Sequence, residues 1–210
     1  MKYVSIDIET TGLDRDLCKI LSIGAVIEDT NNPLPLDELP TFHCAILRDS
    51  FHGEFVAINM NAKLIETITR YKTSKTLEEK KSISIETGMR FLREDEVLHN
   101  LAPWLLMNGI PADSNTSNKI YITVAGKNFA TFDKVFLEKL PRWRELISIR
   151  QRIIDPSILF TDWESDESLP SLLQCKQRAG ISGEVTHNAV EDAMDVIQIL
   201  RTQYVTPKNK

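Results

Sequence analysis

The sequence predicts an α/β fold, in which helices cover a sheet that begins with antiparallel strands. Three β-rich segments joined by short connections open the chain, at residues 2–9, 19–27 and 42–47. Short connections favour antiparallel neighbours. Strand and helix patterns then alternate up to an amphipathic helix over residues 188–204, and this alternation is typical of a helix-covered sheet.

Length and composition predict one domain that spans residues 1–210. The chain is 42% hydrophobic and 26% charged, which is enough apolar material for a packed core. No apolar run approaches the roughly 20 residues of a membrane helix, and acidic residues occupy the place of a signal peptide's apolar region. We therefore expect a cytoplasmic protein without membrane contact. Three widely spaced cysteines predict reduced thiols: Cys18, Cys44 and Cys175.

The charge balance limits how the chain can bind a polyanion. It has 25 basic and 30 acidic residues and a net charge of −5. This excludes a generally basic coat, so nucleic-acid binding has to be local or assisted by metal ions. Residues 63–81 are an exception, because six basic side chains less three acidic ones leave +3 there. A solvated face is the first interpretation of this run and a phosphate contact the second.

The N-terminal elements follow from period-two alternation. Residues 2–9 place Val4, Ile6 and Ile8 on one side, which predicts a strand with one apolar face. A turn follows at residues 10–12, and a hairpin-type turn closes the second strand at residues 29–32.

The segment over residues 49–93 is treated as a variable insertion. Apolar residues at helical spacing predict a helix over residues 60–71, whereas the polar residues 73–86 predict an exposed arm or mobile loop. The later elements expected are helices over 94–107, 132–140, 169–179 and 188–204, a central strand over 119–125, a short strand over 152–155, and a polar tail over 205–210.

A pair of carboxylates ends the first strand. Asp7 and Glu9 are two residues apart, so both side chains leave the same face. Adjacent like charges repel, and a fold tolerates them when a cation such as Mg²⁺ or Mn²⁺ lies between them. The alternative is the polar outer face of an edge strand. The turn at Thr10–Leu13 favours the functional interpretation, because a tight turn exposes backbone N–H groups next to the pair.

A histidine and two more aspartates lie at predicted helix starts. Asn188 is a good N-cap with Glu191 three residues on, which leaves His187 outside the helix and Asp192 one turn inside. Histidine is suited to deprotonate water near neutral pH. Asp133 opens the helix after the strand at 119–125. Taken singly, these residues are more often a surface histidine and ordinary N-terminal helix acids.

As a set, these residues resemble the DEDDh 3′→5′ exonucleases, which include proofreading subunits, RNase T and oligoribonuclease. The segment DIETTGL at Asp7–Leu13 is similar to the first motif of that family, Asn128–Asp133 to the second, and HNAVED from His187 to the third. The likeness extends over about residues 3–200 with 49–93 outside it. The five-residue spacing from Asn128 to Asp133 is more like oligoribonuclease than a proofreading subunit.

The resemblance implies an RNase H-like mixed sheet, with antiparallel first strands and then parallel ones, and two-metal phosphodiester hydrolysis. Two divalent ions, Mg²⁺ or Mn²⁺, would be held by Asp7, Glu9, Asp133 and Asp192. Asp7 would bridge both ions, and His187 would deprotonate the attacking water.

It also implies a substrate, the 3′ end of single-stranded DNA or RNA, from which nucleoside monophosphates are removed. Oligoribonuclease-type scavenging of short RNAs and a retired nucleic-acid-binding or scaffold module remain alternatives, although all five catalytic positions are filled. Partners implied beyond nucleic acid are a second copy of the chain or a polymerase or other replication protein. Expected substrate contacts are Thr10, Thr11, Gly12, Leu13, Asn128 and Phe132, with Phe129 as an alternative stacking residue.

Overall fold

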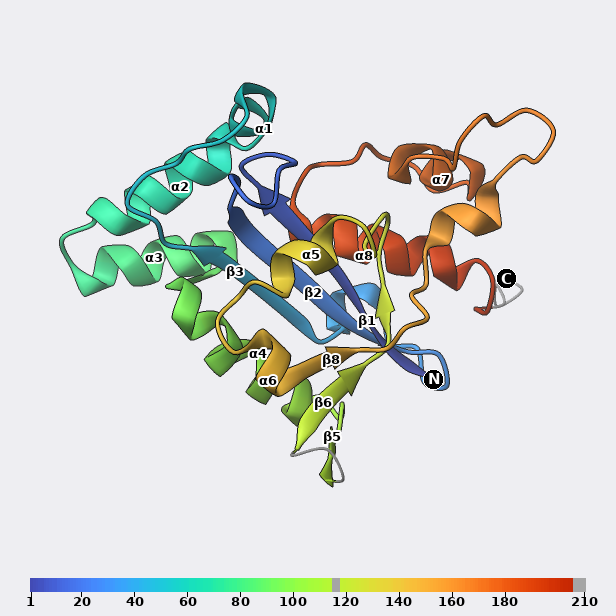
Figure 1. Ribbon diagram of the computed structural model, residues 1–210, viewed down its shortest axis with the longest axis horizontal. Coiled ribbons are helices and arrows are strands. Elements are labelled where there is room, and N and C mark those ends of the chain that lie inside the picture. The colour runs from blue at the N-terminus through green and yellow to red at the C-terminus, as the bar shows by residue number, and fades with distance from the viewer. Residues whose placement is uncertain (115–117, 206–210) are drawn as a thin grey trace.

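A five-stranded mixed sheet forms the centre of the computed structural model, which describes residues 1–114 and 118–205 (Figure 1). The strand order is β4-β3-β2-β1-β7. β1 pairs with β2 and β2 with β3 in antiparallel fashion, whereas β3–β4 and β1–β7 are parallel. This confirms the predicted mixed α/β sheet. The strands are β1 (Lys2–Thr10), β2 (Ile20–Asp29), β3 (Thr41–Ile46), β4 (Arg90–Leu92) and β7 (Val124–Ala125).

The prediction of one central strand over residues 119–125 was wrong. The chain pairs first in a separate three-stranded sheet and then, beyond Thr123, in the main sheet beside β1. Both halves of this segment have a high β-propensity. That propensity does not say which strand each half pairs with. The expected strand over 152–155 is reduced to one bridge between Ala125 and Ile154. The smaller sheet consists of β5 (Ala112–Asp113), β6 (Lys119–Ile122) and β8 (Ile147–Ile149).

Helices cover both faces of β1, so its predicted single apolar face was also wrong. Tyr3 and Ser5, expected on the polar side, are 1% and 0% exposed. Tyr3 packs with α8 (Ala189–Arg201), and the opposite face of the strand packs with α4 (Val97–Met107). Alternation indicates which residues share a face, but the exposure of that face depends on the layer above it.

Residues 49–93 form ordered helices and one strand of the main sheet. The prediction of an arm or loop at residues 73–86 was wrong, since α3 (Leu77–Thr87) packs beside α2 (Ala62–Thr73) with Ile83 buried. α3 begins with a capping box, in which the Thr76 side chain accepts from the Glu79 N–H. With α1 (Phe55–Met60), these helices project beyond the β3 side of the sheet (Figure 1).

The remaining helices are short and connect the layers. The Asp155 side chain caps the 3₁₀ turn η4 (Pro156–Phe160), accepting from the Ser157 N–H at 2.9 Å. Residues 206–210 of the expected tail lie outside the described residues. Within residues 1–114 and 118–205, no helix has the length and apolar character that crossing a bilayer demands. The other short helices and 3₁₀ turns are η1 (Leu36–Glu38), η2 (Glu94–Glu96), α5 (Asp133–Leu137), α6 (Trp143–Leu146) and α7 (Leu172–Arg178). Of these, α5 is shorter than expected.

Candidate active site

A cavity of about 490 Å³ lies at the end of β1, where four segments of the chain meet. The segments are β1 with its following turn, the α1 region of residues 54–61, the residue before α5, and the start of α8. The cavity therefore gathers parts of all three sequence motifs together with the inserted segment. Its lining includes Asp7, Glu9, Thr10, Gly12, Leu13, Glu54, Val56, Ala57, Met60, Asn61, Phe132, His187 and Asp192.

The strand pair Asp7 and Glu9 lies on the floor of this cavity, on the sheet face that α8 covers. Asp7 lies opposite Gly24 of the neighbouring strand β2, and Glu9 lies opposite Ser22 of the same strand. A Cβ at Gly24 would lie 2.2 Å from the carbonyl carbon of Ala189. The absence of a side chain at Gly24 thus lets the start of α8 approach the sheet beside Asp7.

Asp133 reaches the same place from α5. Its Oδ1 accepts a hydrogen bond of 3.1 Å from the backbone N–H of Ile8, the residue between the two strand carboxylates. The side chain is 2% exposed. The hydrogen bond fixes the first turn of α5 against β1, and so brings the middle aspartate to the pair, as the sequence predicts.

The start of α8 supplies the histidine and the fourth carboxylate. The Asn188 side chain caps the helix, accepting from the N–H groups of Val190 and Glu191. His187 precedes it with a left-handed φ of 53°, a conformation that costs energy for a residue other than glycine. Ligand atoms of Glu9, His187 and Asp192 all lie within 4.8 Å of one another.

All four carboxyl groups of the site have a raised pKa. Burial is the largest cause throughout, and it raises the pKa of Glu9 and of Asp133 to about 7 and that of Asp192 to about 6. For Asp7, burial and the charges of Asp133, Asp192 and Glu9 raise the pKa well above its usual range. Asp192 Oδ1 is buried without a hydrogen-bond partner among the described residues. Such a site fits divalent cations, which would neutralise the cluster and take up the free oxygen.

The turn after β1 does not present free N–H groups, contrary to the expectation from the sequence. The Leu13 N–H donates to the Glu54 carboxylate at 2.8 Å, and the Gly12 N–H donates to Thr10 Oγ1 at 3.3 Å. Thr11 donates its N–H to the Lys19 carbonyl. Glu54 comes from the inserted segment, so the sequence pattern of the turn alone does not reveal this acceptor.

The other expected substrate residues divide into two groups. Leu13 and Phe132 line the cavity, and Leu13 is 74% exposed. Thr11 is fully buried, with its hydroxyl accepting from the Lys19 N–H, and Phe129 lies in the core. Asn128 is exposed at a φ of 56°, outside the cavity lining, where the Lys127 ammonium donates to its side chain.

Sequence reasoning missed the contribution of the inserted segment to the site. Glu54, Val56, Ala57, Met60 and Asn61 line the cavity, although residues 49–93 were set apart as variable. The one signal in the sequence is the apolar run FVAINM, which leaves Val56 66% and Met60 49% exposed in the structure. Exposed apolar side chains beside polar ones often mark a binding surface.

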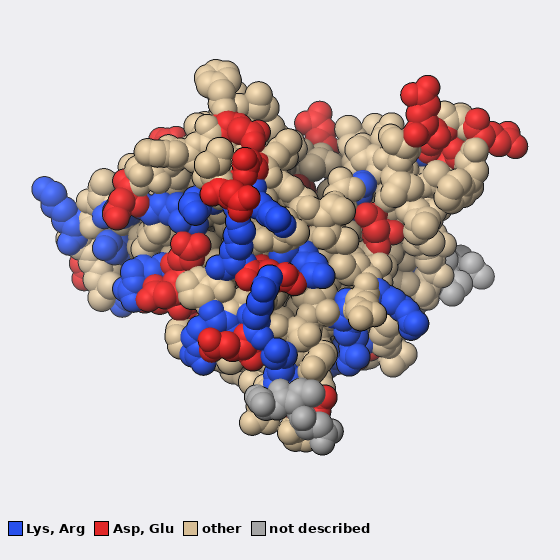
Figure 2. All heavy atoms as spheres, viewed as in Figure 1, with Lys and Arg blue, Asp and Glu red and all other residues tan. Residues whose placement is uncertain are grey.

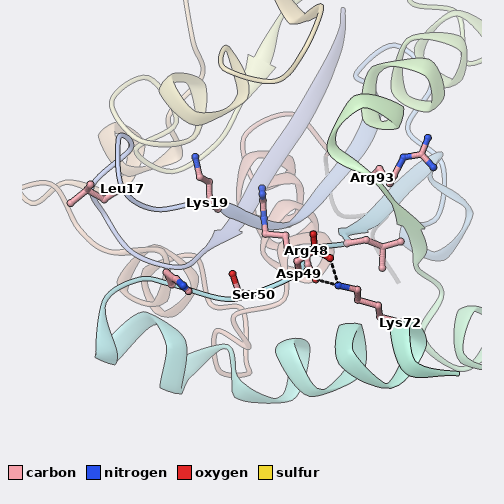
Figure 3. A pocket seen from close by; sticks show the side chains of 9 residues that line it. Leu17, Lys19, Arg48, Asp49, Ser50, Lys72 and Arg93 are labelled. Atoms are coloured by element: carbon pink, nitrogen blue, oxygen red, sulfur yellow. Dashed lines mark hydrogen bonds and ion pairs between the residues drawn. The ribbon is translucent and has the colours of Figure 1, made fainter.

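A larger cavity, about 650 Å³, lies between the β1–β2 connection and α2 and shares no lining residue with the carboxylate cavity (Figure 3). Lys19, Arg48, Lys72 and Arg93 line it. Three of these cations are paired: Arg48 with Glu94, Lys72 with Asp49, and Arg93 with Asp95 and Glu96. Basic and acidic side chains likewise alternate over this part of the surface (Figure 2). The cavity is therefore close to charge balance.

Several solved structures with a similar fold are nucleases. Cell-death related nuclease 4 matches with a TM-score of 0.56 over 95% of this chain at 13% identity. E. coli exonuclease I in complex with an oligonucleotide matches with a TM-score of 0.56 over 96% at 14% identity. The chain has the exonuclease fold. Exonuclease I from Methylocaldum szegediense matches with a TM-score of 0.53 over 99% at 19% identity.

The exonuclease fold is RNase H-like, as the sequence predicts. No protein-family model matches the chain, and no curated protein matches it either. The chain spans 62% of cell-death related nuclease 4 and 41% of either exonuclease I. In this exonuclease fold the carboxylate cavity lies at the end of the first strand, where β1, α5 and α8 meet.

Proposed function

We propose that the protein is a metal-dependent 3′→5′ exonuclease of the DEDDh type, which removes nucleoside monophosphates from the 3′ end of single-stranded nucleic acid. One observation carries this proposal. Asp7, Glu9, His187 and Asp192, from distant parts of the sequence, line one cavity in a chain with the exonuclease fold, and Asp133 accepts from the Ile8 N–H between the first two. Neighbours with oligonucleotides bound support the substrate class.

We assign Asp7, Glu9, Asp133 and Asp192 as the residues that hold two Mg²⁺ or Mn²⁺ ions. The raised pKa values and the unpartnered Asp192 Oδ1 support this assignment, because both indicate missing positive charge. A zinc-bound form of an E. coli exonuclease I complex with single-stranded DNA is known. When bound, such ions stabilise the charge of the phosphoryl transition state and lower the pKa of a bound water.

His187 takes the proton of the attacking water in this proposal. The water oxygen forms a bond to the terminal phosphorus, the bond from phosphorus to the 3′ oxygen of the preceding nucleotide breaks, and that oxygen takes up a proton from solvent. His187 is exposed at the cavity wall, so its imidazole is free to approach the water and then return the proton to solvent.

The terminal nucleotide occupies the apolar part of the carboxylate cavity. Leu13, Val56, Met60 and Phe132 offer surfaces on which a base packs regardless of its identity. An apolar wall without base-specific hydrogen bonds fits an enzyme that removes successive nucleotides.

The test is a cleavage assay with 5′-labelled single-stranded DNA, duplex DNA, long RNA and a dinucleotide RNA, in Mg²⁺, Mn²⁺ or EDTA. We expect a ladder that shortens from the 3′ end in either metal and no cleavage in EDTA, because the carboxylates alone repel the phosphate. The fastest substrate distinguishes trimming from scavenging. A folded protein that cleaves none of these substrates in either metal is instead a retired binding module.

Replacing the histidine tests its role as the base. We expect His187→Ala to lower kcat by about 10²–10⁴-fold, a usual contribution of general base catalysis, with unchanged affinity for Mn²⁺ by calorimetry. The limb of the pH–rate profile that reflects the imidazole should also disappear. His99→Ala is the matched control, because His99 is exposed on α4, away from the cavity. An unaltered pH–rate profile in His187→Ala would rule out this role.

A further inference from the structure

The loop that carries His187 has no regular secondary structure. Residues 181–187 connect α7 to α8 as an open loop, and five of these seven residues are exposed (Figure 1). Buried apolar contacts therefore fix this loop only weakly. His187 comes at its end with a left-handed φ of 53°, so the position of the imidazole depends on the polar contacts of the loop backbone.

Lys176 on α7 supplies two of these contacts. Its ammonium donates to the carbonyl of Glu184, three residues before His187, at 3.1 Å. Its own carbonyl accepts from the Ile181 N–H at 2.9 Å. Within the described residues, no other side chain donates a hydrogen bond to a carbonyl of residues 181–187. Lys176 thus holds the loop both where it begins and shortly before the histidine.

A buried ion pair connects this lysine to the helix of Asp192. The Lys176 ammonium donates to Asp195 Oδ2 at 2.6 Å, and the two residues are only 4% and 9% exposed. Asp195 lies three residues after Asp192, so the two side chains share one side of α8. The Glu184 carbonyl, the ammonium and the Asp195 carboxylate therefore form a continuous chain of hydrogen bonds from the loop to α8.

This ion pair is a costly means of joining α7 to α8. Burial removes the ammonium and the carboxylate from water, and well-packed apolar side chains of similar volume often stabilise a fold equally well or better. Apolar side chains cannot, however, donate a hydrogen bond to the Glu184 carbonyl, as the Lys176 ammonium does. The pair is therefore explained by the position of the loop better than by stability.

Resting on the exonuclease function proposed above, we propose that Lys176 is a positioning residue, which holds the loop before α8 so that the His187 imidazole meets the attacking water. Lys176 is absent from the lining of the carboxylate cavity, so it acts through the histidine and not on the substrate. A small displacement of a reacting group is enough to lower the rate strongly. Loss of the contact with Glu184 should therefore lower kcat and leave the affinity for metal ions unchanged.

The test replaces both members of the ion pair, Lys176→Met together with Asp195→Leu. The new side chains have similar volumes, and the loss of one positive and one negative charge leaves the net charge beside Asp192 unchanged. We expect wild-type or higher stability in urea, unchanged Mn²⁺ affinity by calorimetry, and a kcat about 10–100-fold lower. Amide hydrogen exchange should become faster at residues 181–187. Wild-type kcat or wild-type exchange in this folded variant overturns the proposal.

His187→Ala shows whether Lys176 acts through the histidine. Added to His187→Ala, the double replacement should lower kcat no further, because the imidazole that it displaces is already absent. A second loss of the same size would mean that Lys176 acts on the metal ligands or on the fold, which contradicts the positioning role. Lys72→Met is the matched control, because its ammonium also donates to a carbonyl and to an aspartate, those of Arg48 and Asp49. It should leave kcat unchanged.

A second pair of substitutions, Lys176→Gln with Asp195→Asn, keeps the test decisive if the apolar pair does not fold. It retains two polar side chains that can bond each other, but the glutamine amide is one bond closer to the backbone than the ammonium and should fall short of the Glu184 carbonyl. We expect the same fall in kcat, and a wild-type value overturns the proposal. A wild type that hydrolyses none of the labelled substrates contradicts the exonuclease proposal instead, whereas hydrogen exchange at residues 181–187 still tests the contact.

Discussion

Asp133→Asn is expected to abolish hydrolysis and, at pH 8 without metal, to make the protein more stable than the wild type. The amide keeps an oxygen that accepts from the Ile8 N–H, so the contact between α5 and β1 remains. It loses the negative charge that the proposed metal site uses, and we expect kcat to fall by about 10³-fold or more. Activity in Mg²⁺ and unfolding in urea with EDTA are the two measurements.

The direction of the stability effect follows from proton linkage. The pKa of Asp133 rises from 3.8 in the unfolded chain to about 7 in the folded one, so the folded state binds the proton more tightly. This group therefore causes stability to fall as the pH rises from about 4 to about 7, with a full cost of roughly 2–4 kcal/mol above pH 7. Asparagine removes that cost, so the two proteins should differ at pH 8 and coincide near pH 4.

Two controls accompany this experiment. Asp37→Asn changes an exposed aspartate that does not line the cavity, and should leave activity and unfolding as they are. Mg²⁺ should raise the stability of the wild type at pH 8 more than that of Asp133→Asn, because the ions bind the folded carboxylates. Full turnover in Asp133→Asn would remove this residue from the site, and equal stability at pH 8 would contradict the cost of burying its charge.

Gly24→Ala is expected to disrupt the site from the sheet side. Its Cβ would lie 2.2–2.3 Å from backbone atoms of Ala189 and Val190, which no side-chain rotation relieves. Either the start of α8 moves away from β2, or the substitution costs about 3 kcal/mol or more. Because His187 and Asp192 depend on that helix start, activity should be lost even at temperatures where the variant is folded.

Gly88→Ala is the comparison for Gly24→Ala. Gly88 ends α3 with a φ of 64° and has no atom within 4 Å of an added Cβ. Its substitution should cost only the roughly 1–2 kcal/mol of a left-handed residue and leave hydrolysis intact. Urea unfolding and the cleavage assay on both variants test this contrast. Comparable stability and activity in the two variants would show that the close approach of α8 to β2 is dispensable.

Local sequence patterns predicted much of the fold. The alternation over residues 2–9 and the short connections after it predicted the antiparallel start of the sheet, because both signals come from neighbours in the chain. The cap at Asn188 predicted where α8 begins for the same reason. Local spacing predicted that Asp7 and Glu9 share a strand face, whereas the meeting of the three motifs was implied by their resemblance to the DEDDh exonucleases.

Patterns failed where a distant partner decides the outcome. α3 lacks an apolar stripe at helical spacing, and it is held by its cap and by burial of Ile83 against α2. The strand over 119–125 divides because two different sheets pair with its halves. Packing of this kind depends on contacts with residues far away in the chain. The helix and strand propensities of a segment do not include such contacts.

The sequence by itself determined the identity of the five candidate catalytic residues, the mixed sheet and the cap that starts α8. Only the tertiary structure decided that Glu54 accepts from the Leu13 N–H. It also decided that Asn61 lines both the carboxylate cavity and a neighbouring cavity. The physical reason is that each motif with a candidate catalytic residue is a short continuous stretch on one strand or at one helix start, so the sequence itself displays it. The residues of the inserted segment have a role only through contacts with a turn more than forty positions earlier in the chain.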